Sequence, residues 1–232
     1  MKNVKGAPVS PLRHSLFEKL RRDPEILTLV DKSDEMLGAL GFTDHGRRHV
    51  TLVAMIAAKL LHELGFDDHT RDLAQAAALM HDIGNIGGRH DHASRGAALA
   101  YPLLAARGVT PADAADIIAA IGNHDEVEEG APVSAPSAAL ILADKADIHR
   151  SRVRSRDPNA FDIHDEVNFA VVKSELKVDQ NAKSIVLQLT TDEAASAADV
   201  AELFDARFAL CAQAARFLGC SFAVHINGTQ VR

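Results

Sequence analysis

The chain has 232 residues, a formal net charge of −7 and 47% hydrophobic residues, enough for one large domain with a substantial core. The acidic balance argues against general nucleic-acid binding, and no run of about 18 apolar residues predicts a membrane span. Residues 1–20 lack the apolar segment of a signal peptide, and Cys211 and Cys220 lack metal-type spacing and indicate a reducing compartment. We therefore expect a cytoplasmic protein.

The chain as far as residue 157 is predicted to be helical, because apolar residues recur there with helical spacing. Capping residues mark several starts, such as Asp23 before Pro24, and Gly65 marks an end. For three helices only the start is predicted, at about residue 12, at residue 24 and at residue 111. For three others the whole span is predicted, from 43–44 to 65, from 67 through the pair at 81–82, and from 137 to 152.

The pattern changes near residues 157–158, where strand-like alternation replaces helical spacing. The segments VVKSELKVD and SIVLQLTT, with a turn at DQNAK, predict a β-hairpin. A helix over 199–218 and a last strand, SFAVHI, are expected to follow. The predicted fold class is therefore mostly α, with an HD-type helical bundle over residues 1–157 and a small α+β (β-β-α-β) appendage over residues 158–232.

The adjacent pair His81-Asp82 is the strongest indication of function. It lies in the run LAQAAALMHDIGNIGG, whose alanine stripe directs the pair toward the protein interior. A carboxylate that faces the interior costs several kcal/mol unless it is paired or bound to a metal. The pair therefore needs a charged partner or a metal ion in the folded protein.

Other histidine and aspartate residues follow in an order that suits a two-metal site. His49 and His124 each share the inward stripe of a predicted helix, and the segments RHDHASRGA and LADKAD offer further candidates. The further candidates come in pairs, His90 or His92 and Asp144 or Asp147. Taken singly, each residue is more often a satisfied polar core residue than a ligand, but the ordered set favours ligands.

One arrangement of these residues holds two metal ions. Imidazole nitrogens and carboxylate oxygens suit Fe, Mn, Co, Ni or Zn, so one or two divalent transition metal ions are the expected cofactors. A carboxylate can bridge two ions about 3.5–4 Å apart, and such ions lower the pKa of a shared water and yield a hydroxide nucleophile. The first ion is assigned to His49, His81, Asp82 and Asp144, and the second to Asp82, His92 and His124.

The sequence around these residues resembles the HD superfamily of metal-dependent phosphohydrolases. The resemblance rests on HGRRHVTLVA, LMHDIGN, HASRGAA, NHDE and LADKAD, in that order, over residues 45–155. It implies an all-helical core and a mono- or dinuclear metal site. The family's Ala-Asp pattern selects Asp144 over Asp147, and the Gly-Ala context after His92 favours it over His90.

The two additional histidines are similar to those of dinuclear members, namely the HD-type diadenosine tetraphosphate hydrolases and the HD-GYP cyclic-dinucleotide phosphodiesterases. The single His124 after Asn123 resembles the hydrolases more closely. The Gly-Tyr-Pro motif is absent, because the chain reads VEEGAPVSAP at that point, which disfavours cyclic di-GMP as a substrate. Asn85 stands where many members carry lysine.

The predicted function is hydrolysis of a nucleotide or other small phosphoester by a metal-activated hydroxide. Asp82 is the expected bridging ligand, and Lys145 and Arg95, each within one turn of a proposed ligand, are expected to hold phosphate. His45 is expected to be a surface residue or a neighbour of a helix cap. The partners expected are a small phosphorylated substrate and a second copy of the chain, docked through the appendage.

Two other functions fit the same residues. A di-iron oxygenase uses a similar set of histidine and aspartate ligands in this fold, so ligand types alone do not separate oxygenation from hydrolysis. A metal-stabilised regulatory or binding module is the non-enzymatic alternative, because the edge of the appendage's sheet could pair with another subunit.

Overall fold

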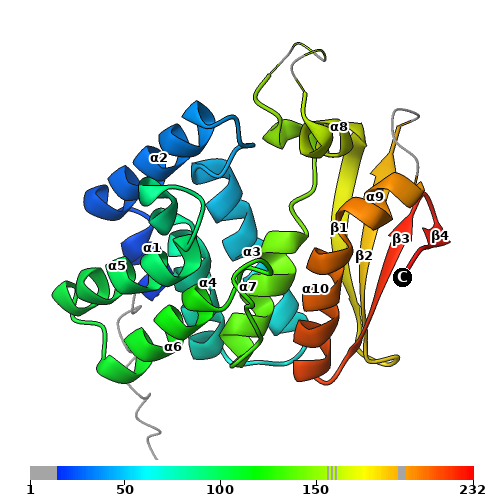
Figure 1. The fold of residues 1–232 in the computed structure, drawn as a ribbon. Coiled ribbons are helices and arrows are strands. Elements are labelled where there is room, and N and C mark those ends of the chain that lie inside the picture. The colour runs from blue at the N-terminus through cyan, green and yellow to red at the C-terminus, as the bar shows by residue number, and fades with distance from the viewer. Residues whose placement is uncertain (1–14, 156, 158, 160, 193–196) are drawn as a thin grey trace, which may run out of the picture.

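A computed structural model describes residues 15–155, 157, 159, 161–192 and 197–232 (Figure 1). Helices make up most of it, which confirms the mostly α class. Figure 1 shows a body of helices on one side and a small sheet on the other, with α10 between α7 and the sheet. The expected helix start near residue 12 lies outside the described residues, although a helix begins at Leu16.

The bounds of the elements follow the chain. The helices of the first part are α1 (Leu16–Leu20), α2 (Pro24–Ala39), α3 (Arg47–Glu63), α4 (Asp68–Met80), the 3-10 helix η1 (Ile83–Gly87), α5 (His92–Ala106), α6 (Pro111–Gly122), α7 (Ala135–Lys145) and the 3-10 helix η2 (Arg150–Arg152). The remaining elements are α8 (Ile163–Ala170), β1 (Val171–Asp179), β2 (Ser184–Thr191), α9 (Ala197–Leu203), α10 (Asp205–Phe217), β3 (Ser221–Ile226) and β4 (Thr229–Gln230).

Side-chain caps explain where several helices begin. The Asp23 carboxylate accepts amide hydrogens at the start of α2, and Asp67 does so at the start of α4. Thr110 and Ser134 cap α6 and α7 in the same way. Gly65 has a φ of +83°, the left-handed conformation that ends a helix, so the predicted stop after α3 is confirmed.

Several predicted helix boundaries are wrong. The long helix α3 starts at Arg47 with Gly46 as its N-cap, not at residues 43–44, and the Asp44 carboxylate instead accepts a hydrogen bond from Gly46 N. Helix α7 ends at Lys145 rather than at residue 152. The helix expected over 199–218 is two helices, α9 and α10, because the backbone leaves the helical region at Phe204.

The sheet has the order β1-β2-β3-β4. Strands β1 and β2 pair antiparallel, which confirms the predicted hairpin, and β2 and β3 pair parallel across the α9–α10 connection. The short strand β4 then pairs antiparallel with β3. The prediction of the appendage therefore omitted two elements that the structure contains. They are β4, which is too short to show alternation, and α8, which precedes β1.

One hydrophobic cluster extends from the helical body into the C-terminal layer. It includes Leu140 of α7, Phe208 and Cys211 of α10 and Val224 of β3, all of them buried. The division into a domain over residues 1–157 and an appendage over residues 158–232 stays a prediction. None of the described helices is long and apolar enough to cross a membrane.

Candidate metal centre

The six candidate ligands come from five segments of the helical body. His49 lies in the first turn of α3, and His92 is the first residue of α5. His81 is the C-cap of α4, and Asp82 comes directly after it. The pair therefore follows a helix, and the prediction that it lies on one is wrong. His124 likewise follows the end of α6, and Asp144 lies in the last turn of α7. Helix ends therefore position most of the site.

Close backbone packing brings α5 to the His81-Asp82 pair. At Gly84, which lies in η1, a Cβ would overlap the carbonyl oxygen of His92 and the amide nitrogen of Gly96. Gly96 in turn faces the carbonyl oxygen of His81. Position 84 therefore requires glycine, Gly96 leaves little room for a Cβ, and the close approach places His92 beside Asp82.

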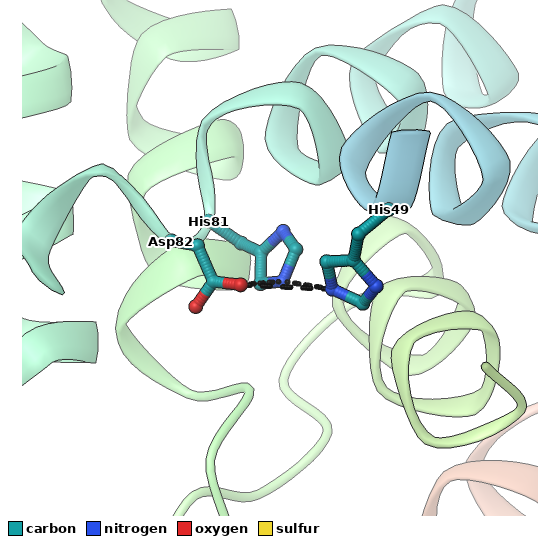
Figure 2. Close-up of side chains that lie close together, drawn as sticks. All are labelled: His49, His81 and Asp82. Carbon is teal, nitrogen blue, oxygen red and sulfur yellow. Dashed lines mark hydrogen bonds and ion pairs between the residues drawn. The ribbon is translucent and has the colours of Figure 1, made fainter. Parts of the chain in front are cut away.

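Four side chains converge at the first predicted metal position. Figure 2 shows the imidazoles of His49 and His81 and the carboxylate of Asp82 directed toward one another. The two Nε2 atoms lie 3.3 Å apart, and Asp82 Oδ2 lies 3.0 Å from His81 Nε2 and 3.6 Å from His49 Nε2. Asp144 Oδ1 completes the group, 3.3 Å from His49 Nε2 and 3.6 Å from His81 Nε2.

The second predicted position lies on the other side of the same carboxylate. His92 Nε2 is 3.6 Å from Asp82 Oδ1 and 3.1 Å from His124 Nε2. The ligand atoms of Asp82, His92 and His124 all lie within 4.8 Å of one another. The structure thus brings all six candidates together, with one oxygen of Asp82 turned toward each group. Their roles as ligands stay a prediction.

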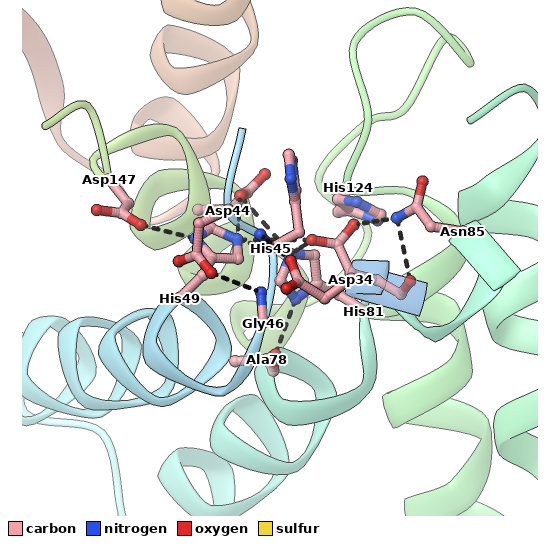
Figure 3. Close-up of polar contacts among 12 residues, drawn as sticks. Asp34, Asp44, His45, Gly46, His49, Ala78, His81, Asn85, His124 and Asp147 are labelled. Carbon is pink, nitrogen blue, oxygen red and sulfur yellow. Dashed lines mark hydrogen bonds and ion pairs between the residues drawn. The ribbon is translucent and has the colours of Figure 1, made fainter. Parts of the chain in front are cut away.

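The tautomers of the four imidazoles favour a cation between them. Each Nδ1 faces a carbonyl or carboxylate oxygen, which can only accept, so Nδ1 carries the hydrogen and the Nε2 of a neutral ring is left with a lone pair. Figure 3 shows two of these contacts, His49 on Asp147 and His81 on the Ala78 carbonyl. The acceptors are Asp147 Oδ2 for His49 (2.7 Å) and the carbonyl oxygens of Ala78 for His81 (2.8 Å), Arg89 for His92 (3.1 Å) and Ile121 for His124 (2.7 Å).

The carboxylate of Asp82 also fits a metal ion. Its Oδ2 is buried and, when His81 and His49 are neutral, accepts no hydrogen bond from the described residues, although Asn85 Nδ2 donates to Oδ1 at 2.8 Å. Burial disfavours the charged form of Asp82, but the charge of the neighbouring His81 has the larger effect and holds the pKa of Asp82 well below its usual range. Converging lone pairs around an unsatisfied buried oxygen are the donor set that a divalent transition metal requires.

Without a metal ion, a proton on His81 supplies part of the positive charge that the carboxylates require. Burial disfavours the charged imidazole, but the carboxylates of Asp82 and Asp144 raise the pKa of His81 to about 10. At His124, burial and the nearby charges of His81 and His92 lower the pKa to about 3, so this ring is neutral. The metal-free site therefore carries a proton that a cation must displace.

Asp147 positions His49 instead of joining the cluster. Its carboxylate is 2% exposed and accepts from His49 Nδ1 at 2.7 Å and from Arg48 Nη2 at 2.8 Å. The Nε of Arg152 lies 3.8 Å away. A carboxylate behind a histidine fixes the ring's tautomer and orientation, and so prepares Nε2 for a metal.

The two predicted phosphate contacts differ in their placement. Lys145 is buried beside the cluster, where its Nζ lies 2.9 Å from Asp144 Oδ2 and 2.7 Å from Glu126 Oε2. The structure does not bring Arg95 to the cluster, because its guanidinium donates to three carbonyl oxygens of the preceding loop. Those oxygens belong to Gly84, Gly88 and His90. Arg95 thus holds η1 against α5.

A narrow polar cavity, about 10 Å³ in volume and partly open to solvent, lies beside the ligands. Asp82, His124 and Asp144 line one part of it. The other lining residues are His45, Arg89, Lys145, Arg152 and Arg207. His45 directly precedes Gly46, the N-cap of α3, so the expectation that it neighbours a helix cap is confirmed. Its half-buried ring also lines the cavity, and its Nδ1 donates to Thr43 O at 2.7 Å, which the sequence did not indicate.

Fold and site together define a helical bundle whose histidine and aspartate side chains converge in an arrangement that could hold divalent cations. The chain belongs to the HD domain family, whose model matches residues 46–163, just over half of the sequence. This is the metal-dependent phosphohydrolase superfamily that the motifs indicated. Comparison with curated proteins and with solved structures gave no match. All six candidate ligands lie inside the matched segment, whereas α10 and the sheet lie outside it.

The chain is expected to bind about two divalent ions, because two of the three overlapping groups of donor atoms share Asp82. His92→Ala and His124→Ala should each lose the second ion and keep the first. The measurement is elemental analysis of protein reconstituted with Mn²⁺ or Co²⁺ and freed of excess metal. One ion per chain in the wild type, unchanged in both variants, would contradict a dinuclear site.

Metal binding is expected to strengthen as the pH rises, by about tenfold per pH unit between about pH 7 and 9. The cause is His81, whose pKa of about 10 in the metal-free fold means that a proton must leave before Nε2 can bind a cation. The same proton stabilises the metal-free fold fully below the ordinary histidine pKa of 6.5, and this stabilisation is lost as the pH rises through about 10. Competition with a chelating dye across this range measures the effect. An affinity independent of pH would contradict it.

Proposed function

We propose that the protein is a metal-dependent phosphohydrolase that cleaves a nucleotide or another small phosphoester. The observation that carries the proposal is the buried Oδ2 of Asp82, with the Nε2 atoms of two imidazoles and a second carboxylate around it. Divalent ions held there would supply a water of lowered pKa and would neutralise charge on the phosphoryl oxygens. Water then adds across the P–O bond, with oxygen going to phosphorus and a proton to the leaving group.

The chain's own residues prepare this reaction. Asp147 and three backbone carbonyls hold the imidazoles with their Nε2 atoms turned inward. Lys145 fixes the second oxygen of Asp144 and leaves the first toward the histidines. Burial opposes a charged lysine, but the charges of Asp144 and Glu126 raise its pKa, so Lys145 is a cation at neutral pH.

The cationic side chains beside the ligands favour hydrolysis over oxygenation. Arg89, Lys145, Arg152 and Arg207 line the cavity. Guanidinium groups match the oxygens of a phosphoryl group, whereas an uncharged polyol requires none of them. The same ligands could bind two iron ions for oxygen activation, so the reaction has to be tested directly.

The test is turnover on a panel of nucleotides, phosphomonoesters and phosphodiesters, with and without oxygen. The protein is loaded with the metal found in freshly purified material, or with Mn²⁺ or Co²⁺. A phosphohydrolase releases phosphate or a nucleotide at the same rate under anaerobic conditions. Strict dependence on oxygen, with one O₂ consumed per product, would overturn hydrolysis and favour the oxygenase. Metal-loaded protein with no turnover on any member of the panel would favour a binding module.

A further inference from the structure

The C-terminal helix α10 contributes a cation to the cavity beside the metal ligands. Helix α10 lies outside the segment that matches the HD family and packs beside α7 (Figure 1). Arg207, in its first turn, lines the same cavity as Asp82, His124 and Asp144. A residue of the layer after residue 163 therefore reaches the site that the family segment builds.

Two contacts hold the Arg207 guanidinium in this position. Its Nε donates to Glu126 Oε1 at 3.0 Å, and its central carbon lies 4.9 Å from the centre of the Phe204 ring. The described residues offer its two terminal nitrogens no hydrogen bond or ion pair. Arg207 is thus anchored at its Nε and free to donate at its outer edge.

Arg152 lines the cavity as well and carries an unsatisfied donor. The residue is 4% exposed, its Nε donates to Asp44 O at 3.0 Å, and its Nη1 donates to Asp147 O at 3.1 Å. Its Nη2 is buried and has no hydrogen-bond partner among the described residues. A buried guanidinium nitrogen without an acceptor is costly, so this position calls for an anionic ligand.

The charges around the cavity indicate how much negative charge that ligand carries. Four cations line it, and five carboxylates line it or pair with these cations. The cations are Arg89, Lys145, Arg152 and Arg207, and the carboxylates are Asp82, Asp125, Glu126, Asp144 and Asp147. Divalent ions bound to the histidines and aspartates would add uncompensated positive charge. A terminal phosphoryl group, with up to two negative charges, neutralises more of it than a diester with one.

We propose that Arg152 and Arg207 form a subsite for the terminal phosphoryl group of a phosphomonoester, so that α10 completes the substrate site of this chain. The inference rests on the proposed function and narrows its substrate class from phosphoesters in general to phosphomonoesters, including nucleotides with a terminal phosphate. The guanidinium of Arg207 holds one side of the group and Arg152 Nη2 the buried side. The metal ligands line the same cavity.

The test measures binding of inorganic phosphate to the full, metal-loaded chain by calorimetry at about pH 8, where phosphate is mainly a dianion. Arg207→Gln should weaken phosphate binding about tenfold or more, because a charge-assisted hydrogen bond is lost. Arg216→Gln is the matched control. Arg216 lies on the same helix, is exposed and is not among the residues that line the cavity, so its substitution should leave affinity unchanged. Metal content and the melting temperature should be the same in both variants.

A second variant and a second probe sharpen the result. Arg207→Lys keeps the charge beside Glu126 but loses the planar fork, so phosphate should bind several-fold more weakly even if Arg207→Gln fails to fold. Dimethyl phosphate, a diester anion, should bind at least about tenfold more weakly than inorganic phosphate to the wild type. Unchanged phosphate affinity in the Arg207 variants, or equal binding of the two probes, would overturn the subsite.

The subsite and the proposed function fail in different ways. If the wild type hydrolyses phosphoesters but the Arg207 variants bind phosphate normally, the subsite is wrong and the function stands. If phosphate binding depends on Arg207 and yet no phosphoester is hydrolysed, the subsite stands and the proposed function is wrong.

Discussion

Replacing Asp82 with alanine is expected to remove both metal ions and to lower any phosphohydrolase activity by roughly 10³-fold or more. One oxygen of this carboxylate faces His49 and His81, and the other faces His92. Its removal takes a ligand from both positions at once, whereas His124→Ala takes one from the second position alone. Elemental analysis and steady-state kinetics on the same samples measure the two effects.

The matched control for this variant is Asp116→Ala. Asp116 is an exposed aspartate on α6, outside the cluster, so its loss should change neither metal content nor rate. The metal-free wild type provides a second comparison, because Asp82→Ala should resemble it in activity. Full metal content in Asp82→Ala would show that the bridge is wrongly assigned.

Replacing Asp147 with asparagine is expected to weaken metal binding by about 10- to 100-fold without removing any candidate ligand. Asparagine keeps an oxygen that can accept from His49 Nδ1 but loses the charge that makes the imidazole a stronger donor to a cation. The substitution also leaves the nearby cations Arg48 and Arg152 without their shared carboxylate, so we expect a loss of stability of about 3–5 kcal/mol. Metal titration and denaturant unfolding measure the two quantities.

The control for Asp147→Asn is Asp44→Asn. Asp44 Oδ2 also pairs with Arg48, at 2.9 Å, but its side chain makes no contact with His49. If metal affinity falls only in Asp147→Asn, orientation of His49 is the cause. If both variants lose affinity equally, the effect comes from Arg48, and the positioning role of Asp147 is wrong.

The pH dependence of stability gives an independent check on Asp147. Burial raises the pKa of this carboxyl, whereas the hydrogen bond from His49 and the charge of Arg152 lower it. The lowering is larger, so the pKa of Asp147 lies below its ordinary value of 3.8. A lowered pKa in the fold means that the carboxylate contributes stability above the ordinary pKa and that this contribution is lost as the pH falls. Asp147→Asn should therefore flatten the acid side of the stability curve.

The helical class, the hairpin and the candidate ligands could be predicted from local patterns. Apolar spacing shows which side of a helix faces inward, and His49 and Asp144 lie on such sides. Caps such as Asp67 and stops such as Gly65 act within one turn, so they are legible in the sequence. The ordered motifs around His81-Asp82 pointed to the family, which the family match confirms.

Only the tertiary structure decided which side chains share the cavity, because that depends on contacts between segments distant in the chain. Arg95 lies one turn from His92, yet its guanidinium turns to loop carbonyls, while Arg207 meets Glu126 across 81 positions. His45 precedes its helix and carries no periodic signal, although its ring lines the cavity. Local spacing specifies the direction of a side chain relative to its own helix. The packing of α10 beside α7 specifies what that side chain meets, and no local pattern encodes it.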